Sequence, residues 1–252
     1  MIVPPGEGHL ASGASGTGRL ADLDDIIDTI RAVLGRGGDL ARRVIVVTAG
    51  GTQEAIDPVR VIANHSSGKM GFALAQAARD RGAQVTLIAG VTARRVPRGV
   101  QFISAPSAAE MRAAVLRAMV DADALVMAAA VADFRPEQTA DQKIKKGNAE
   151  TLTLELVRNP DILVQVAKSA QRPALVVGFA AETEDLLAHA RAKLESKNLD
   201  LIVANAVPSA FGSDIDQATL IARGGAVTAL PPLTKEDLSE KILDFVVGRL
   251  NM

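Results

Sequence analysis

The sequence predicts an α/β fold: a Rossmann-like, doubly wound and mostly parallel sheet with helices on both faces. Short β-branched runs, most of them continuously apolar, alternate with helical stretches, as expected for parallel strands that are buried on both sides. Of the 252 residues, 48% are apolar, 23% are charged and 21 are glycines, which is typical of one globular domain or one domain with an appendage.

Residues 1–39 are predicted to form an N-terminal tail and one short helix. The stretch from Met1 to Gly18 carries five Gly and two Pro, so we expect a loop without a fold of its own. From Leu23 to Leu34 the apolar residues lie on one helical face, Asp residues stand near the start, and Gly35 follows the end. We place the boundary of the main domain near residue 40, so that residues 40–252 form the second unit.

The main domain is predicted to alternate strands with helices. The expected strands are Val44–Thr48, Gln84–Ala89, Gln101–Ser104, Ala124–Ala129, Ala174–Phe179 and Leu201–Ala204. The expected helices are Gly68–Arg81, Ala108–Val120, Ile162–Ala170, Glu184–Ser196 and Lys235–Leu250. Three segments break this order, because Thr151–Val157 alternates at period two and Ala218–Ala222 with Ala226–Leu230 flank an Arg-Gly-Gly turn. We expect these extra strands to serve dimerisation.

Missing residue types and balanced charge exclude several classes of protein. The absence of Cys excludes disulfides, thiolate metal sites and cysteine nucleophiles, and it fits the cytoplasmic location that we expect. The absence of Tyr excludes the tyrosine-dependent reductases. With 28 basic and 29 acidic residues the chain has no general attraction for a polyanion, and its apolar runs are short for a membrane span. We therefore expect neither nucleic acid nor a membrane as a partner.

The loop after the first predicted strand is unusually long. It lies within TAGGTQEAIDPVRVIANHSSGKMG, and eighteen residues, Ala49–Ser66, separate the strand from the next helix, against roughly 4 to 6 in most connections. Ligands bind at the carboxyl ends of the strands in such sheets, so this length favours a binding function. Gly50 and Gly51 let a phosphate approach the backbone, although a tight turn needs the same residues.

Polar side chains near the end of this loop are candidate ligand contacts. Arg60 offers a bidentate fork for phosphate or carboxylate, and the amide of Asn64 can both donate and accept hydrogen bonds. Ser66 and Ser67 fit more simply as caps of the helix that follows. His65 beside Ser66 does not indicate a hydrolase, because the chain lacks a G-x-S-x-G nucleophile elbow.

A second cluster, MAAAVADFRPEQTADQKIKK, spans residues 127–146. Its three alanines leave space for a base or sugar beside the backbone, or for close helix packing, and Asp133 follows as a ribose or metal partner. Residues 136–148 are poor in apolar side chains and include Lys143. Such a segment is either a solvated loop or a flap that brings positive charge over a triphosphate and excludes water.

Two further clusters lie near predicted strand and helix ends. Residues 158–161 precede a helix whose free amides at Ile162–Gln165 can receive a polar group of a ligand, although Asp161 also fits as the N-cap of that helix. Farther along, GFAAETE ends a strand, and Lys193 and Lys197 share a face of the next helix because they are four residues apart. Either lysine alone would be typical of a surface.

These motifs, in this order, resemble phosphopantothenate–cysteine ligase, the synthetase half of the bacterial bifunctional coenzyme A biosynthesis protein. The matching segments lie within about residues 40–250 and are TAGGTQEAIDPVRVIANHSSGKMG, AAAVADFRP with QKIKK, LVRNPDI, VGFAAETE and KNLDLIVAN. The resemblance implies that the carboxylate of 4'-phosphopantothenate attacks the α-phosphate of CTP, giving an acyl-cytidylate and diphosphate. The amine of L-cysteine then displaces CMP. It also implies magnesium with the triphosphate, held by ligands left open here, and a homodimer with the site at the subunit interface.

The resemblance further implies roles for residues that match the family motifs. Asn64 would hold the acyl intermediate, Arg60 would help to place the phosphopantothenate part, and Lys143 would reach the phosphates from the flap. The nucleotide would be contacted by Met127, Ala128, Ala129, Asp133, Ile162, Leu163, Val164, Gln165, Phe179, Lys193 and Lys197. Catalysis would come from positioning and charge stabilisation, since no protein nucleophile is needed.

Two departures from the family pattern modify these expectations. The stretch EGHLASGASGTGRLADLDDI resembles the end of the flavin-dependent decarboxylase half, but Ser12 stands where that family carries Cys, and the rest of that half is missing. We therefore expect no flavin and no decarboxylase activity in this chain, and a longer parent chain in which it is fused to a decarboxylase domain. Ala206 stands where Asp or Asn is expected, which leaves a polar role there without support.

Two other functions fit the sequence less well. A nicotinamide-dependent dehydrogenase would need G-x-G-x-x-G in the first loop and an acidic residue after the second strand, where the chain has Ala89-Gly90-Val91. A catalytically silent nucleotide-binding module would not need Asn64 and Lys143. Release of pyrophosphate with CTP, phosphopantothenate and magnesium separates both alternatives from the ligase.

Overall fold

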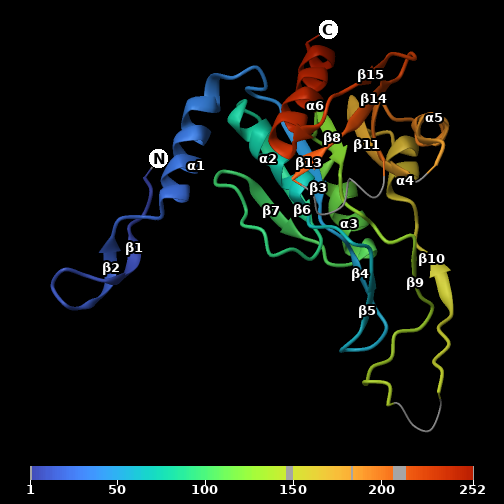
Figure 1. Ribbon diagram of the computed structural model, residues 1–252, viewed down its shortest axis with the longest axis horizontal. Coiled ribbons are helices and arrows are strands. Elements are labelled where there is room, and N and C mark those ends of the chain that lie inside the picture. The colour runs from blue at the N-terminus through green and yellow to red at the C-terminus, as the bar shows by residue number, and fades with distance from the viewer. Residues whose placement is uncertain (1, 146–149, 183, 207–213, 252) are drawn as a thin grey trace.

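A central sheet of eight strands organises the protein (Figure 1). The computed structural model describes residues 2–145, 150–182, 184–206 and 214–251. The strand order is β15-β14-β12-β11-β8-β3-β6-β7. The parallel strands are β3 (Val44–Ala49), β6 (Gln84–Ala89), β7 (Gln101–Ser104), β8 (Ala124–Met127), β11 (Leu175–Glu182) and β12 (Leu201–Ala206). At one edge, β14 (Ala218–Ala222) and β15 (Val227–Ala229) pair in antiparallel fashion. The predicted sheet and its extra hairpin are therefore confirmed.

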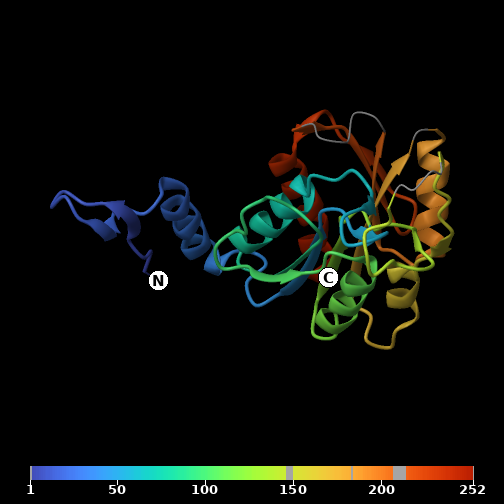
Figure 2. The ribbon, with the colours of Figure 1, turned by 90° about the horizontal axis from the view of Figure 1, so that it is seen from below.

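Helices cover both faces of this sheet, as predicted (Figure 2). The helices are α1 (Leu23–Leu34), α2 (Lys69–Asp80), α3 (Ala108–Ala118), α4 (Ile162–Lys168), α5 (Leu186–Ser196) and α6 (Lys235–Leu250). Ile45 and Val47 of β3 pack in the core with α2 and α6, whereas Val46 packs in the core with α3, α4 and α5. Because successive side chains of a strand point to opposite faces, a strand covered on both sides is apolar at every position.

The start of α2 is placed at the carboxyl edge of the sheet, where a ligand is expected. Its N-cap residue is Gly68, whose φ of 75° lies in the left-handed region that suits glycine. Gly71, in the first turn, lets α2 lie against the end of β3, since a Cβ there would come 2.5 Å from the Cβ of Ala49. The expected capping by Ser66 or Ser67 takes a weaker form, because their hydroxyl groups accept hydrogen bonds only at 3.4 Å from amides two residues further on.

Side-chain caps begin two other helices. Ser107 and Glu110 form a capping box at the start of α3, and the Thr234 hydroxyl accepts a hydrogen bond from the Asp237 amide at 3.0 Å at the start of α6. In the described part of the chain, every helix is too short or too polar to cross a membrane. Two short antiparallel pairs of strands lie outside the central sheet. One is β4 (Gln53–Ala55) with β5 (Val61–Ala63) in the long first loop, and the other is β13 (Ile215–Asp216) with β16 (Leu233–Thr234) before α6.

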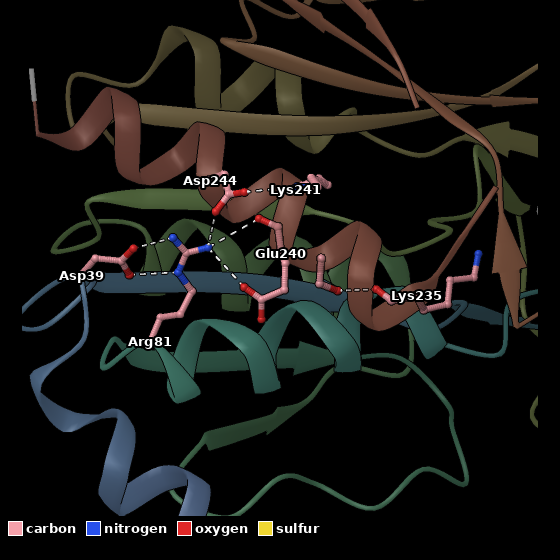
Figure 3. A network of polar contacts seen from close by, with 7 residues as sticks. Asp39, Arg81, Lys235, Glu240, Lys241 and Asp244 are labelled. Atoms are coloured by element: carbon pink, nitrogen blue, oxygen red, sulfur yellow. Dashed lines mark hydrogen bonds and ion pairs between the residues drawn. The ribbon is translucent and has the colours of Figure 1, made fainter. Parts of the chain in front are cut away.

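Ion pairs at the end of α2 hold the N-terminal segment to the main domain. Arg79, with 4% of its side chain exposed, lies 2.6 Å from Asp28 of α1. The next arginine, Arg81, lies 2.5 Å from Asp39 and contacts Glu240 and Asp244 of α6 at 3.2 and 2.9 Å (Figure 3). Hydrogen bonding to the Arg81 guanidinium lowers the pKa of Asp39 below its ordinary value.

Two predicted segments differ from the structure. Residues 1–18, expected to lack structure, contain the antiparallel hairpin of β1 (Gly6–His9) and β2 (Ser15–Arg19), which extends away from the main domain (Figure 2). Backbone pairing needs no apolar side chain, so the glycine-rich composition concealed this hairpin. Of Thr151–Val157, only the end is a strand, because β10 (Leu156–Arg158) pairs with β9 (Phe134–Pro136) and residues 151–155 lie outside the ladder. Alternation alone does not make a strand where no neighbouring edge accepts its hydrogen bonds.

Candidate active site

Three adjoining cavities lie at the carboxyl edge of the sheet. The inner cavity, of about 160 Å³, lies between the ends of β8 and β11 and the start of α4. The central cavity, of about 330 Å³, lies between the start of α2 and the ends of β8, β11 and β12. These two share Ala129, Val131, Asp133, Phe179 and Lys193. The outer cavity, of about 770 Å³, meets the central cavity at Ser66 and Ser67.

The inner cavity collects most of the residues predicted to contact the nucleotide. Those that line it are Met127, Ala129, Asp133, Ile162, Leu163, Phe179, Lys193 and Lys197. Ala128 lines the central cavity instead. Lys193 is oriented by the sheet, since its ammonium donates a hydrogen bond at 2.8 Å to the carbonyl oxygen of Phe179. Four separated stretches of sequence thus meet around one small cavity.

Two predicted contacts, Val164 and Gln165, do not line the inner cavity because their polar groups are engaged elsewhere. The Val164 amide donates to the Asp161 carboxylate at 3.0 Å, and the Gln165 amide donates to the Asp161 carbonyl oxygen at 3.3 Å. The Gln165 side-chain oxygen accepts from Arg112 at 2.6 Å. The interpretation of Asp161 as the N-cap of α4 is confirmed. Burial raises the pKa of Asp161, but hydrogen bonds from Lys197 and the Val164 amide outweigh burial, so the pKa lies below its ordinary value.

Buried threonines fix the segment after β8 against the first loop. The hydroxyl groups of Thr48 and Thr52 accept hydrogen bonds at 3.1 and 2.9 Å from main-chain amides of that segment, and both residues are fully buried. The exposed side chain of Asn64 donates to the carbonyl oxygen of Val131 at 3.2 Å. Asn64 therefore lines the central cavity beside the wall that this cavity shares with the inner one. Neither threonine was predicted to be a site residue, and the only sequence signal of either is a hydroxyl within or next to an apolar strand.

A buried polar cluster forms the far wall of the central cavity. The ammonium of Lys235 and the side-chain amide of Asn205 each lie 2.5 Å from one oxygen of Asp216. The other Asp216 oxygen and the Asn205 oxygen have no hydrogen-bond partner among the described residues, although both side chains are more than nine-tenths buried. This cluster was not predicted from the sequence. Its one signal is that Lys235 stands on the apolar face of its helix, three and seven residues before Leu238 and Ile242.

Arg60 and Lys143 line none of these three cavities. Arg60 pairs with the buried carboxylate of Asp57 and donates to the carbonyl oxygen of Ile144 at 3.0 Å, while the Ile144 amide donates to Asp57 at 3.0 Å. Lys143, next to this contact, is exposed. Hydrogen bonding to Arg60 outweighs burial and lowers the pKa of Asp57 well below its ordinary value. Ile144 thus contacts Arg60 and Asp57, and neither Arg60 nor Lys143 lines the central cavity with Asn64.

Comparison with known proteins places the chain in a family. Residues 40–250 match the sequence model of the DNA/pantothenate metabolism flavoprotein C-terminal domain. The chain belongs to this family. One relative is the coenzyme A biosynthesis bifunctional protein CoaBC of Mycobacterium tuberculosis, which is 46% identical to this chain over 98% of its length. The chain spans 63% of the length of that relative.

Solved structures agree with membership in the flavoprotein C-terminal domain family. The crystal structure of the C-terminal domain of CoaBC is 36% identical, with a TM-score of 0.74 over 85% of this chain and 98% of that domain. The H337A variant of Cab2, solved in complex with phosphopantothenate-cysteine, is 17% identical with a TM-score of 0.68 over 92% of this chain, and it shows the shared fold. The family resemblance drawn from the sequence motifs is confirmed.

Proposed function

We propose that this domain is a CTP-dependent phosphopantothenate–cysteine ligase of coenzyme A biosynthesis. The observation that carries the proposal is that the inner cavity gathers eight predicted nucleotide contacts and opens beside Asn64 in the central cavity. The names of the relatives support it, since CoaBC belongs to coenzyme A biosynthesis and the Cab2 variant was solved with phosphopantothenate-cysteine.

The proposed reaction has two balanced steps. In the first, an oxygen of the phosphopantothenate carboxylate bonds to the α-phosphorus of CTP and diphosphate leaves. In the second, the nitrogen of cysteine bonds to the acyl carbon, the acyl–oxygen bond to CMP breaks, and a proton leaves the nitrogen. Neither step needs a protein nucleophile, so the chain acts by holding reacting groups together and by stabilising charge.

The inner and central cavities then have one task each. The inner cavity binds the base and ribose, with Phe179, Ala129 and Leu163 around them, and Lys193 lies on the wall toward the phosphates. The neutral amide of Asn64, at the central cavity, donates to an oxygen of the acyl group and accepts from the attacking amine. Arg60 and Lys143 would serve a site that a second subunit completes, since in their own chain they lie outside the cavities.

Magnesium would enter with the triphosphate. Magnesium is usually held by one or two carboxylates together with substrate phosphates, and the Asp133 carboxylate lines both cavities between which the phosphates would lie. Within the described ranges, no three His, Cys, Asp or Glu side chains are grouped so as to hold a metal by themselves. Asp133 therefore fits a nucleotide-borne ion, whose chemistry would be to neutralise the phosphate charge.

Assembly and location form part of the same proposal. We propose that this domain forms a cytoplasmic homodimer. We also propose that it belongs to a longer chain with a decarboxylase domain, because it spans only 63% of the length of the CoaBC relative. Leu152, Leu154 and Leu156 alternate along an exposed segment, with 36 to 53% of each residue accessible, and would be covered in a dimer. Sedimentation at micromolar concentration tests this. A single species near 26.2 kDa would contradict the dimer.

Release of pyrophosphate tests the ligase itself. With CTP, phosphopantothenate and magnesium we expect release of pyrophosphate, and with added cysteine we expect phosphopantothenoylcysteine and CMP. Omission of phosphopantothenate is the control for simple hydrolysis of CTP. Competition between CTP and ATP tests the base, since the inner cavity of about 160 Å³ suits the smaller pyrimidine. No pyrophosphate with either nucleotide would end the proposal, and tighter binding of ATP would overturn the cytidine preference.

A further inference from the structure

The outer cavity has no task in the mechanism above. It lies between the start of α2, the loop after β6 and the start of α6. Ser66 and Ser67 form the boundary that it shares with the central cavity, where Asn64 lies. A molecule in the outer cavity would therefore be next to the acyl group that the proposed first step produces.

Two opposite charges in this cavity lack ionic partners. Arg94 stands over the ring of Phe72, with its guanidinium carbon 5.9 Å from the ring centre, and Phe72 is buried. The guanidinium of Arg94 and the carboxylate of Glu236 have neither a hydrogen bond nor an ion pair within the described part of the chain. The neighbouring Arg95 also lines the cavity, but it pairs with Asp25 of α1. One positive and one negative group thus remain available.

The Arg94 side chain is prearranged by its surroundings. Its main-chain amide donates to the Thr92 hydroxyl at 3.1 Å, which bends the loop, and the aromatic face of Phe72 holds the flat guanidinium. Asp214, whose pKa is lowered chiefly by its hydrogen bond to Lys69 and to a smaller degree by the charge of Arg94, is already paired with Lys69. Arg94 therefore keeps its planar set of donors for an incoming group.

We propose that Arg94 and Glu236 bind the zwitterion of the α-amino acid that the ligase joins to its acyl substrate, an inference that rests on the proposed function. The guanidinium would bind the amino acid carboxylate through two parallel hydrogen bonds, and Glu236 would bind its ammonium, which loses one proton to the solvent before the neutral amine attacks the acyl carbon. The charge balance selects this class of ligand. A diphosphate would be attracted by Arg94 but repelled by Glu236, and an apolar molecule would strip water from both charges without replacing it.

Comparison of cysteine with cysteamine, which lacks the carboxylate, tests the Arg94 contact. A charge-assisted contact of this kind is worth about ten- to a hundredfold in kcat/KM, so the parent protein should prefer cysteine by about that factor. Arg94→Gln should lose most of this preference, while pyrophosphate release in the absence of any amine stays at the parental rate. Arg249→Gln is the matched control, because Arg249 stands 5.3 Å over Phe245 on α6 and lines none of the three cavities.

The Glu236 contact is tested in the same assay. Glu236→Gln should raise the KM for cysteine and for cysteamine alike, since both carry the ammonium. Circular dichroism checks that each variant is folded, as expected because Arg94 and Glu236 are exposed.

Several results would overturn the inference. Equal losses with cysteine and cysteamine in Arg94→Gln would show that Arg94 does not read the carboxylate. Weaker CTP binding in that variant would assign the cavity to the triphosphate. If the parent protein makes no product, the proposed function fails, and calorimetric titration with cysteine decides the inference alone: binding that Arg94→Gln abolishes supports it, and no binding by the parent protein overturns it.

Discussion

Replacement of Lys235 by Met is expected to destabilise the fold strongly while nearly preserving the length of the side chain. The ammonium of Lys235 lies 2.5 Å from Asp216, and the two side chains are only 8% and 1% exposed. Without the ammonium, the buried carboxylate keeps the Asn205 amide as its partner, since its other oxygen has none among the described residues. Removal of one member of a buried ion pair costs about 3 to 5 kcal/mol.

Urea unfolding followed by circular dichroism measures this loss directly. In thermal unfolding of a chain of this length, each kcal/mol of lost unfolding free energy lowers the melting temperature by about 2 to 4 °C, so a decrease of about 6 to 20 °C is expected. Lys241→Met is the matched control on the same helix. Its ammonium lies 3.9 Å from Asp244 and both side chains are more than half exposed, so its loss should stay below about 1 kcal/mol.

A double variant tests whether the unpaired charge is the cause. Lys235→Met combined with Asp216→Leu removes both charges, and apolar replacement of a buried pair is often neutral or stabilising. The double variant should therefore be more stable than Lys235→Met alone, with a coupling free energy of about 2 kcal/mol or more. The reasoning is refuted if Lys235→Met costs less than about 1 kcal/mol, or if the second substitution destabilises the protein further.

Three further predictions concern other positions. Asn64→Asp should weaken stabilisation of the acyl-cytidylate more than it weakens CTP binding. Lys143→Gln should slow formation of the acyl-cytidylate about a hundredfold or more, because loss of one charged transition-state contact is worth about 3 to 4 kcal/mol. Near-parental rapid-quench rates in both variants would contradict these roles. Gly71→Ala should cost about 1 to 3 kcal/mol in urea unfolding, because the added methyl group overlaps β3, and an unchanged midpoint would count against that packing. The lowered pKa of Asp161 means that its carboxylate stabilises the fold above its ordinary pKa and ceases to do so as the pH falls below about 4. The difference in melting temperature between the parent protein and Asp161→Asn should therefore vanish in acid, and a difference independent of pH would disprove it.

The sequence predicted the parts of the fold in which local pattern and burial agree. A strand such as Val44–Ala49 is covered on both faces, so every position is apolar and the run is visible in the sequence. The alternation at Thr151–Val157 predicted a strand that is mostly absent, since alternation is a property of one segment whereas a ladder needs two paired segments. The hairpin at Gly6–Arg19 was missed for the opposite reason, because its pairing depends on the backbone.

The candidate site was predictable where the motifs bring residues together and unpredictable where tertiary contacts do so. Asp133, Phe179 and Lys193 meet at the inner cavity as expected, because the carboxyl ends of neighbouring parallel strands share an edge. Asn205 and Lys235 contact one carboxylate from segments with no common spacing, and the position of Lys235 on the apolar face of its helix is the one sequence signal of this contact. Arg60 and Lys143 line none of the three cavities, because the spacing of residues along a long loop does not show where the loop places its side chains.

The close approach of the N-terminal segment to the end of α2 determines where an independently expressed fragment should begin. Gly35 and Gly38 lie so near that a Cβ at either position would overlap a carbonyl oxygen of Asp80 or Arg81. Asp39 binds Arg81 on the same side (Figure 3). A fragment cut at residue 40, where composition changes, would leave the end of α2 uncovered and would remove one of the three carboxylates that pair with Arg81, inviting aggregation during purification. A fragment that starts before Gly35 keeps this cover, and is the better choice for crystallisation or ligand screening.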